Sequence, residues 1–197
     1  MIKKSDMSKI LHNCWKKYQI IKTEHDNEVA YYYKHWSATD ARDKEHELNK
    51  IFMEKLNDLQ AAYRNIINEK MDTVVNELKE IMTTPEDVNI INQLEAFKNG
   101  GMIGKIEFSA LAEKYNKNYL ASRILSEIAL KNNIEFHFTP LDALFTLAET
   151  IRNKCLNAIN DLTNGGFAFA ITEKAVDDWT NNLIANNYFS PDNRMAI

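Results

Sequence analysis

Glycine and proline are scarce in this chain, which holds 5 Gly and 3 Pro in 197 residues, below average usage. A β-sandwich needs many tight turns, and a nucleotide-binding α/β sheet needs glycine-rich loops. The chain has little material for either architecture. Its 45% hydrophobic and 26% charged residues are ordinary for a folded domain. We therefore expect an all-α protein.

The sequence leads us to expect neither a leader sequence nor a membrane-spanning segment. Its first residues, MIKKSDMSK, contain neither an apolar stretch nor a small-residue cleavage site. No run approaches the ~18 apolar residues that span a bilayer. The two cysteines, Cys14 and Cys155, stand far apart. We expect a cytoplasmic protein with reduced thiols and no membrane partner.

An excess of basic charge is missing as well. Residues 1–82 carry 14 basic and 14 acidic side chains, whereas residues 83–197 carry 10 and 14, which accounts for the net charge of −4. Proteins that bind DNA phosphates usually present a basic face, because Lys and Arg supply most of the affinity. The composition therefore argues against a nucleic-acid partner.

The first predicted helix runs from Met7 to about Trp36. Its apolar residues recur at offsets of three and four, which places them on one stripe: Ile10, Leu11, Cys14, Trp15, Tyr18 and Ile21. Three successive tyrosines, Tyr31 to Tyr33, then sweep about 200° of the helix surface. Either this stretch is buried on two sides, or its spare face meets another subunit.

A second, much longer helix is predicted up to Met82, because no Gly or Pro occurs after Ser37. Ser37 or Thr39, followed by Asp40, is suited to cap its start. Its apolar residues alternate at three and four, with a stutter at Ile66–Ile67. Forty residues make a rod of about 60 Å. Its apolar edge needs cover from a helical hairpin or from a second chain; the alternative is a surface helix of a monomeric bundle.

The second half of the chain predicts a smaller helical domain over residues 84–189. Thr84-Pro85 and Thr139-Pro140 are helix-start signals, and Gly100-Gly101 and Gly165-Gly166 are expected to terminate helices with left-handed caps. Helices are predicted near 88–99, 106–115, 118–131 and 141–164, with a brief extended segment at 134–138. We expect the apolar run 167–171 to enter the core and Thr172 to cap a last helix. Residues 190–197 are expected to form a flexible tail.

No catalytic or metal-binding constellation stands out. Asp43 and His46 have the (i, i+3) spacing of di-iron bundles, but those sites need a second such pair and two more carboxylates. His12 and Cys14 lie two apart on a helix and so point to different sides. We predict no enzyme activity, no catalytic or metal-binding residue and no cofactor.

One segment is compatible with DNA recognition. Residues 108–125 have the pattern of a helix-turn-helix, with a small Ala112 in the first helix, a short polar turn and Arg123 on the second. The candidate contacts are Lys117, Asn118, Ser122 and Arg123. An ordinary pair of packed helices explains the pattern equally well, so a dimeric DNA-binding regulator stays the alternative prediction.

The segment Val88–Ile134 is also where the chain resembles known proteins. Asn99-Gly100-Gly101, then Glu107-Phe108 with Leu111-Ala112, then Asn118-Tyr119-Leu120-Ala121 with Arg123, are similar to segments of structural or morphogenesis proteins of phages and prophages of low-GC Gram-positive bacteria. The resemblance implies a scaffold-like or minor structural component of a phage head, present in the host cytoplasm or the virion. The chain differs from the best-known scaffolding proteins, which usually end in a basic helix, because it ends in Asn193-Arg194-Met195-Ala196-Ile197.

The sequence thus predicts an N-terminal helical hairpin or coiled coil (residues 1–82), a C-terminal helical domain (84–189) and a tail (190–197). We expect the protein to act by forming a homo-oligomer and by binding another structural protein. The residues predicted to drive oligomerisation are Trp15, Tyr18, Tyr32, Trp36, Phe52, Leu56, Leu59, Tyr63, Ile66, Met71, Val74 and Leu78.

Overall fold

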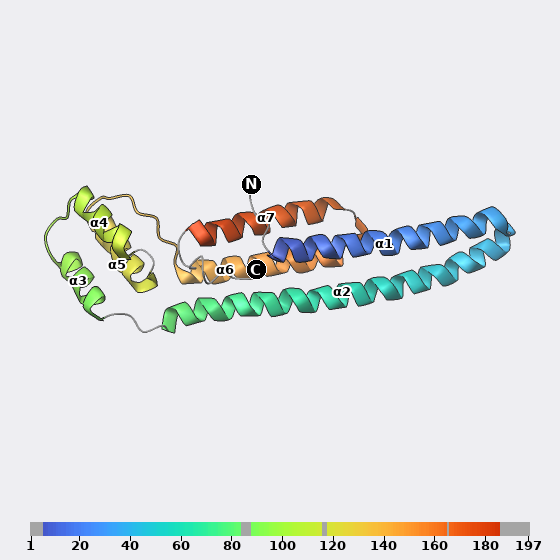
Figure 1. Cartoon of the computed structure of the whole chain (residues 1–197), viewed down its shortest axis with the longest axis horizontal. Helices are drawn as coiled ribbons and strands as arrows, with labels where there is room; N and C mark the ends of the chain where they lie inside the picture. Colours follow the sequence, from blue (N-terminus) through green and yellow to red (C-terminus); the bar gives the residue numbers. More distant parts are fainter. Residues whose placement is uncertain (1–5, 84–87, 116–117, 165, 186–197) are drawn as a thin grey trace. The chain divides into compact units, whose positions relative to one another are not determined.

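The computed structural model describes residues 6–83, 88–115, 118–164 and 166–185. Every regular element in these ranges is a helix (Figure 1), which confirms the all-α prediction. The elements are α1 (Asp6–His35), α2 (Ala38–Thr83), α3 (Val88–Asn99), α4 (Lys105–Tyr115), α5 (Tyr119–Lys131), α6 (Leu141–Asn160), the 3-10 turn η1 (Leu162–Asn164) and α7 (Gly166–Ala185). The predicted start signal at Thr84-Pro85 and the tail 190–197 lie outside the described residues.

The chain divides into two compact units by contact. Unit 1 consists of Met1–Lys70 and Ile151–Asp177, and unit 2 of Met71–Thr150 and Asp178–Ile197. Helices α2, α6 and α7 each supply residues to both units. Residues 151–177 thus group with the N-terminal helices. The predicted division of the chain near residue 83 does not include this grouping.

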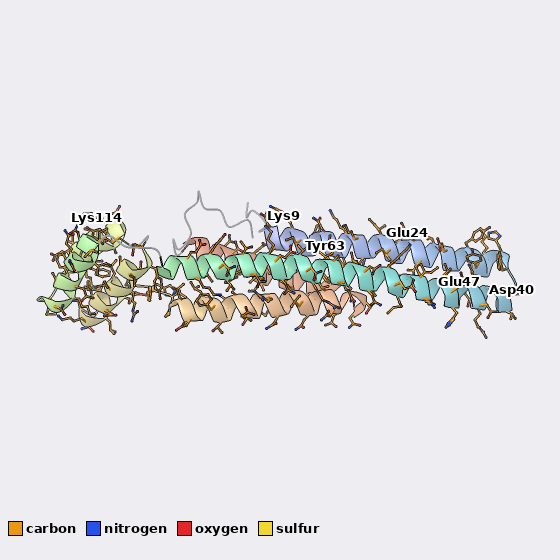
Figure 2. All side chains as sticks on the ribbon, turned by 90° about the horizontal axis from the view of Figure 1, so that it is seen from below. Lys9, Glu24, Asp40, Glu47, Tyr63 and Lys114 are labelled. Carbon is orange, nitrogen blue, oxygen red and sulfur yellow. The ribbon has the colours of Figure 1, made fainter. Side chains whose placement is uncertain are left out.

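In unit 1, α1 and the first part of α2 form an antiparallel hairpin. Ser37 starts α2, because its Oγ accepts the Asp40 N–H at 3.3 Å, as the capping pattern predicts. Contacts between the two helices then pair ever earlier residues of α1 with later residues of α2: Tyr33 with Glu45, His25 with Asn49, and Lys17 with Tyr63. Figure 2 shows Asp40 at the closed end, with Glu24 and Glu47 on the two helices.

Residues of α6 and α7 complete a four-helix bundle around the open end of this hairpin. The Trp15 ring of α1 lies 5.4 Å from that of Phe169 in α7, and His12 Nδ1 lies 3.3 Å from Glu173 Oε1. On the α2 side, the buried Gln60 amide donates to the carbonyls of Ile159 and Asn160 at 3.0 and 3.1 Å. These carbonyls end α6 and have no partner within the helix, so Gln60 fixes the end of α6 against α2.

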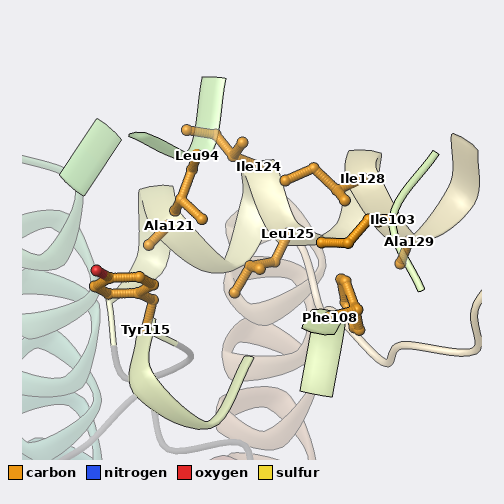
Figure 3. Close-up of a cluster of buried hydrophobic side chains, with 9 residues drawn as sticks. All are labelled: Leu94, Ile103, Phe108, Tyr115, Ala121, Ile124, Leu125, Ile128 and Ala129. Atoms are coloured by element: carbon orange, nitrogen blue, oxygen red, sulfur yellow. The ribbon is translucent and has the colours of Figure 1, made fainter. Parts of the chain in front are cut away.

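In unit 2, α3, α4 and α5 enclose a small apolar core (Figure 3). The core is formed by Leu94, Ile103, Phe108, Tyr115, Ala121, Ile124, Leu125, Ile128 and Ala129. Asn118 caps α5 by accepting the Ala121 N–H at 2.9 Å. At its other end the left-handed Asn133 (φ 54°) lets the Ile134 N–H reach the Ala129 carbonyl at 2.9 Å, a closure typical of helix C-termini.

Two local predictions were wrong. The last helix begins at Gly166, not at Thr172, which is buried six residues inside α7; the apolar run continues the helix, with Phe169 in the core and Ile171 exposed. Gly100 does not form a left-handed cap, since its φ is not positive; its N–H donates to the Ala96 carbonyl at 2.9 Å. Residues 134–138 form neither a helix nor a paired strand, which is compatible with the predicted brief extended segment.

Gly166 stands where a larger residue does not fit. A Cβ at this position would lie 2.7 Å from Cζ2 of Trp15. We expect Gly166→Ala to lower the free energy of unfolding by about 1–3 kcal/mol, because the overpacked indole must shift. In that background, Trp15→Phe should cost less than it does alone, since the smaller ring restores the space. Chemical denaturation of the four variants measures the coupling; strictly additive costs would contradict the predicted clash.

Candidate interaction surface

Most residues of the predicted oligomerisation stripe are buried within the single chain. Those buried are Tyr18, Leu56, Leu59, Tyr63, Met71, Val74 and Leu78; Trp15, Tyr32 and Phe52 are half-buried, and Trp36 and Ile66 are exposed. The chain's own helices therefore cover most of the stripe. At the stutter, Ile67 is fully buried and its neighbour Ile66 is 37% exposed.

The closed end of the hairpin carries a cluster of aromatic side chains. The rings of Tyr31 and His35 lie 4.6 Å apart between centroids and are tilted by 44°, and Tyr32 and Trp36 meet edge-to-face at 4.8 Å. Tyr33 donates its hydroxyl to Glu45, which raises the pKa of Tyr33. Tyr31, Tyr33 and Trp36 nevertheless stay about half exposed. The sequence allowed two possibilities for Tyr31 to Tyr33, burial on two sides or contact with another subunit. Within the single chain these tyrosines are not buried on two sides.

One side of the hairpin gathers exposed apolar residues around an ion pair. Lys55 Nζ of α2 lies 3.7 Å from Glu24 Oε2 of α1, so both side chains mark the same side of the hairpin. Ile20 stands four residues before Glu24 and Tyr31 seven after it, offsets that share a helix face. The exposed fractions of these two side chains are 58% and 57%.

The same side continues along α2. Ile51 precedes Lys55 by four residues, and Ile66 follows it by eleven, which is about three turns. Ile51 is 40% exposed. We call this surface the outer hairpin face and define it by its apolar residues and its ion pair: Ile20, Glu24, Tyr31, Ile51, Lys55 and Ile66.

The outer hairpin face points away from α6 and α7. Trp15, which contacts α7, stands nine residues before Glu24, and Gln60, which contacts α6, stands nine residues after Ile51. Nine residues are about two and a half turns, so each pair lies on opposite sides of its helix. Among the residues of unit 1 that the structure describes, no helix therefore lies on this face.

The helix-turn-helix prediction corresponds to α4 and α5. Ser122, a candidate DNA contact, is buried. Asn118 uses its side chain to cap α5, and Arg123 Nε lies 3.9 Å from Glu127 Oε1. Lys117 lies outside the described residues. Lys98 also binds Glu127, a hydrogen bond that raises the pKa of Lys98. The exposed side of α5 thus presents paired charges beside Leu120 rather than a basic surface.

Neither cysteine has the environment of a reactive thiol. Cys14 and Cys155 are both buried and unbridged, and burial raises the pKa of each thiol to about 12. Both thiols are therefore protonated, and hence poor nucleophiles, at neutral pH. In the part of the chain that the structure describes, His, Cys, Asp and Glu do not gather in groups of three or more that could hold a metal ion.

A pocket between α3 and α5 is lined by three apolar residues, Ile91, Leu120 and Ile124, and by four charged ones, Glu95, Lys98, Arg123 and Glu127. Its charged residues are engaged in ion pairs with one another.

None of the described helices combines the length and apolar character needed to cross a bilayer. No protein-family model, curated protein or solved structure matches this chain.

The burial pattern separates two positions of the stripe that the sequence treats alike. Leu59 is 8% exposed, so Leu59→Asp places a carboxylate in the interior of unit 1. We expect that variant to lose at least about 3 kcal/mol of stability or to fail to fold. At concentrations low enough for the chain to be monomeric, Ile66→Asp should lose less than about 1 kcal/mol, because its carboxylate then reaches water. Thermal unfolding followed by circular dichroism compares them; equal losses would contradict the assigned faces.

Proposed function

We propose that this chain is a non-enzymatic protein that acts by self-association and by binding another structural protein, as a scaffold-like or minor component of phage head assembly. The observation that carries the proposal is the outer hairpin face, where three exposed isoleucines and a tyrosine lie on a long helical hairpin. Exposed apolar residues that gather on one side of an element are typical of interaction sites. The resemblance of residues 88–134 to phage morphogenesis proteins supports the biological setting.

A second group of exposed aliphatic side chains supports a partner other than a second copy. Met102, Ile106 and Leu130 of unit 2 are all more than 80% exposed. They lie where the α3–α4 connection meets the end of α5, since the Ile103 N–H donates to Asn132 Oδ1 at 2.9 Å. This end of the three-helix domain is the surface we assign to the structural partner.

Self-association predicts that the mass of the protein depends on concentration. We expect sedimentation equilibrium of the full chain to show oligomers that dissociate on dilution, because burial of exposed apolar surface is the driving force. The oligomer should persist in high salt, since apolar contacts are not screened. A monomer at every concentration up to the millimolar range would refute the proposal.

The alternative DNA-binding function predicts a different response to salt. Contacts to phosphate would give a steep loss of affinity as salt rises. Because Ser122 is buried and Arg123 lies beside Glu127, we expect no binding of duplex DNA above non-specific levels at 50 mM salt. Fluorescence anisotropy with a labelled duplex measures it; salt-dependent binding that Arg123→Ala weakens would favour the regulator.

A further inference from the structure

We propose that the outer hairpin face is the dimer interface of this protein, and that two copies meet there with their hairpins side by side and pointing the same way. The inference rests on the proposed self-association and adds the surface, the occupant and the orientation. It is argued from the area of the face, its charges and the position of α6 and α7.

The area of the face fits a second hairpin. From the level of Ile66 to Tyr31 the face spans about 20 residues of α1, or roughly 30 Å, and two helices are about 20 Å wide. Each copy therefore offers roughly 600 Å², and two copies would bury roughly 1,200 Å², which is the lower end of stable protein interfaces. Two hairpins packed in this way form a four-helix arrangement, a common solution for long amphipathic helices.

The charges of the face are self-complementary. Glu24 on α1 and Lys55 on α2 stand next to each other, with 3.7 Å between Oε2 and Nζ. A two-fold axis parallel to the hairpin places α1 of one copy on α2 of the other. Glu24 of each copy then faces Lys55 of its partner, so the interface gains two crossed pairs. A two-fold axis across the hairpin would instead bring α1 onto α1 and Glu24 towards Glu24. Opposite charges mainly select the arrangement, while Ile20, Tyr31 and Ile51 supply the affinity.

The opposite side of the hairpin cannot form such a dimer interface along its whole length. Near the open end, α6 and α7 occupy it through Gln60 and Trp15. A second hairpin laid there would collide with these helices. No described helix of unit 1 covers the outer hairpin face from Ile66 to the closed end, which is the length that the area estimate requires.

The test compares two exposed apolar positions on the same helix. Ile51 lies on the outer hairpin face, whereas Met53, which is 49% exposed, lies about 200° further round α2 and so on another side. Both are replaced by Glu in the full chain, and sedimentation equilibrium gives the dissociation constant. We expect Ile51→Glu to raise it at least tenfold, because the interface loses an apolar side chain and must desolvate a carboxylate, and Met53→Glu to leave it within about twofold. Circular dichroism checks that both variants fold.

Charge reversal at Glu24 and Lys55 tests the orientation of the two copies separately. Glu24→Lys should weaken the dimer, because two lysines then meet across the interface, and the double variant with Lys55→Glu should restore it. A dimer that resists Ile51→Glu, or that Met53→Glu weakens equally, would overturn the assigned face while leaving self-association standing. Failure of the double variant to restore the dimer would overturn the orientation. A wild-type chain that is always monomeric would refute the proposed function itself.

Discussion

The packing of α1 against α2 is the constraint on which unit 1 depends. A hairpin of two helices buries one stripe on each helix, and everything else on their surfaces faces water or a further element. Here α6 and α7 supply that element near the open end, where Trp15 and Gln60 meet them. Beyond Tyr18 and Leu59 the hairpin continues to its closed end at Asp40. The exposed residues of the outer hairpin face follow from this geometry.

The interior of the hairpin is partly polar, which is consistent with only two helices meeting there. His25 stacks on Phe52 at 4.8 Å and hydrogen-bonds Asn49 at 2.9 Å. Such contacts fix the pairing of two helices more than they add apolar burial. The large side chains that are fully buried within the hairpin lie towards its open end, in Met7 and Leu11 of α1 and Ile67 of α2, whereas the fully buried residue near the closed end is the small Ala41. Large apolar side chains are therefore buried more completely towards the open end.

The sequence predicted the helices well, since their signals are local. Three- and four-residue spacing and the Ser37 cap act within one turn or two, and most of the observed helix bounds follow such signals. The burial of Leu59 and its neighbours also followed from spacing. What spacing could not give is the identity of the covering helix. Gln60 contacts the end of α6 across about a hundred residues, and no local pattern encodes such a pairing.

For the same reason the candidate site was predicted only in part. The stripe included Ile66 but missed Ile20 and Ile51, because isolated isoleucines on a charged face resemble scattered surface residues. The signal was present in the offsets of four to Glu24 and Lys55, but only the pairing of those two side chains across the hairpin places them on one face. The false start at Thr172 has a related cause, since a threonine before an acidic residue reads as a cap whether or not the helix has already begun.

A distance between two copies tests the central claim most directly. Asn27 is exposed on α1 near the level of the Glu24–Lys55 pair, and a spin label on Asn27→Cys would report there, since both native cysteines are buried. Our account predicts a single short distance between labels on different copies, measured by double electron–electron resonance at concentrations where the protein sediments as a dimer. A dimer whose labels show no dipolar coupling would contradict it, because association would then use another surface.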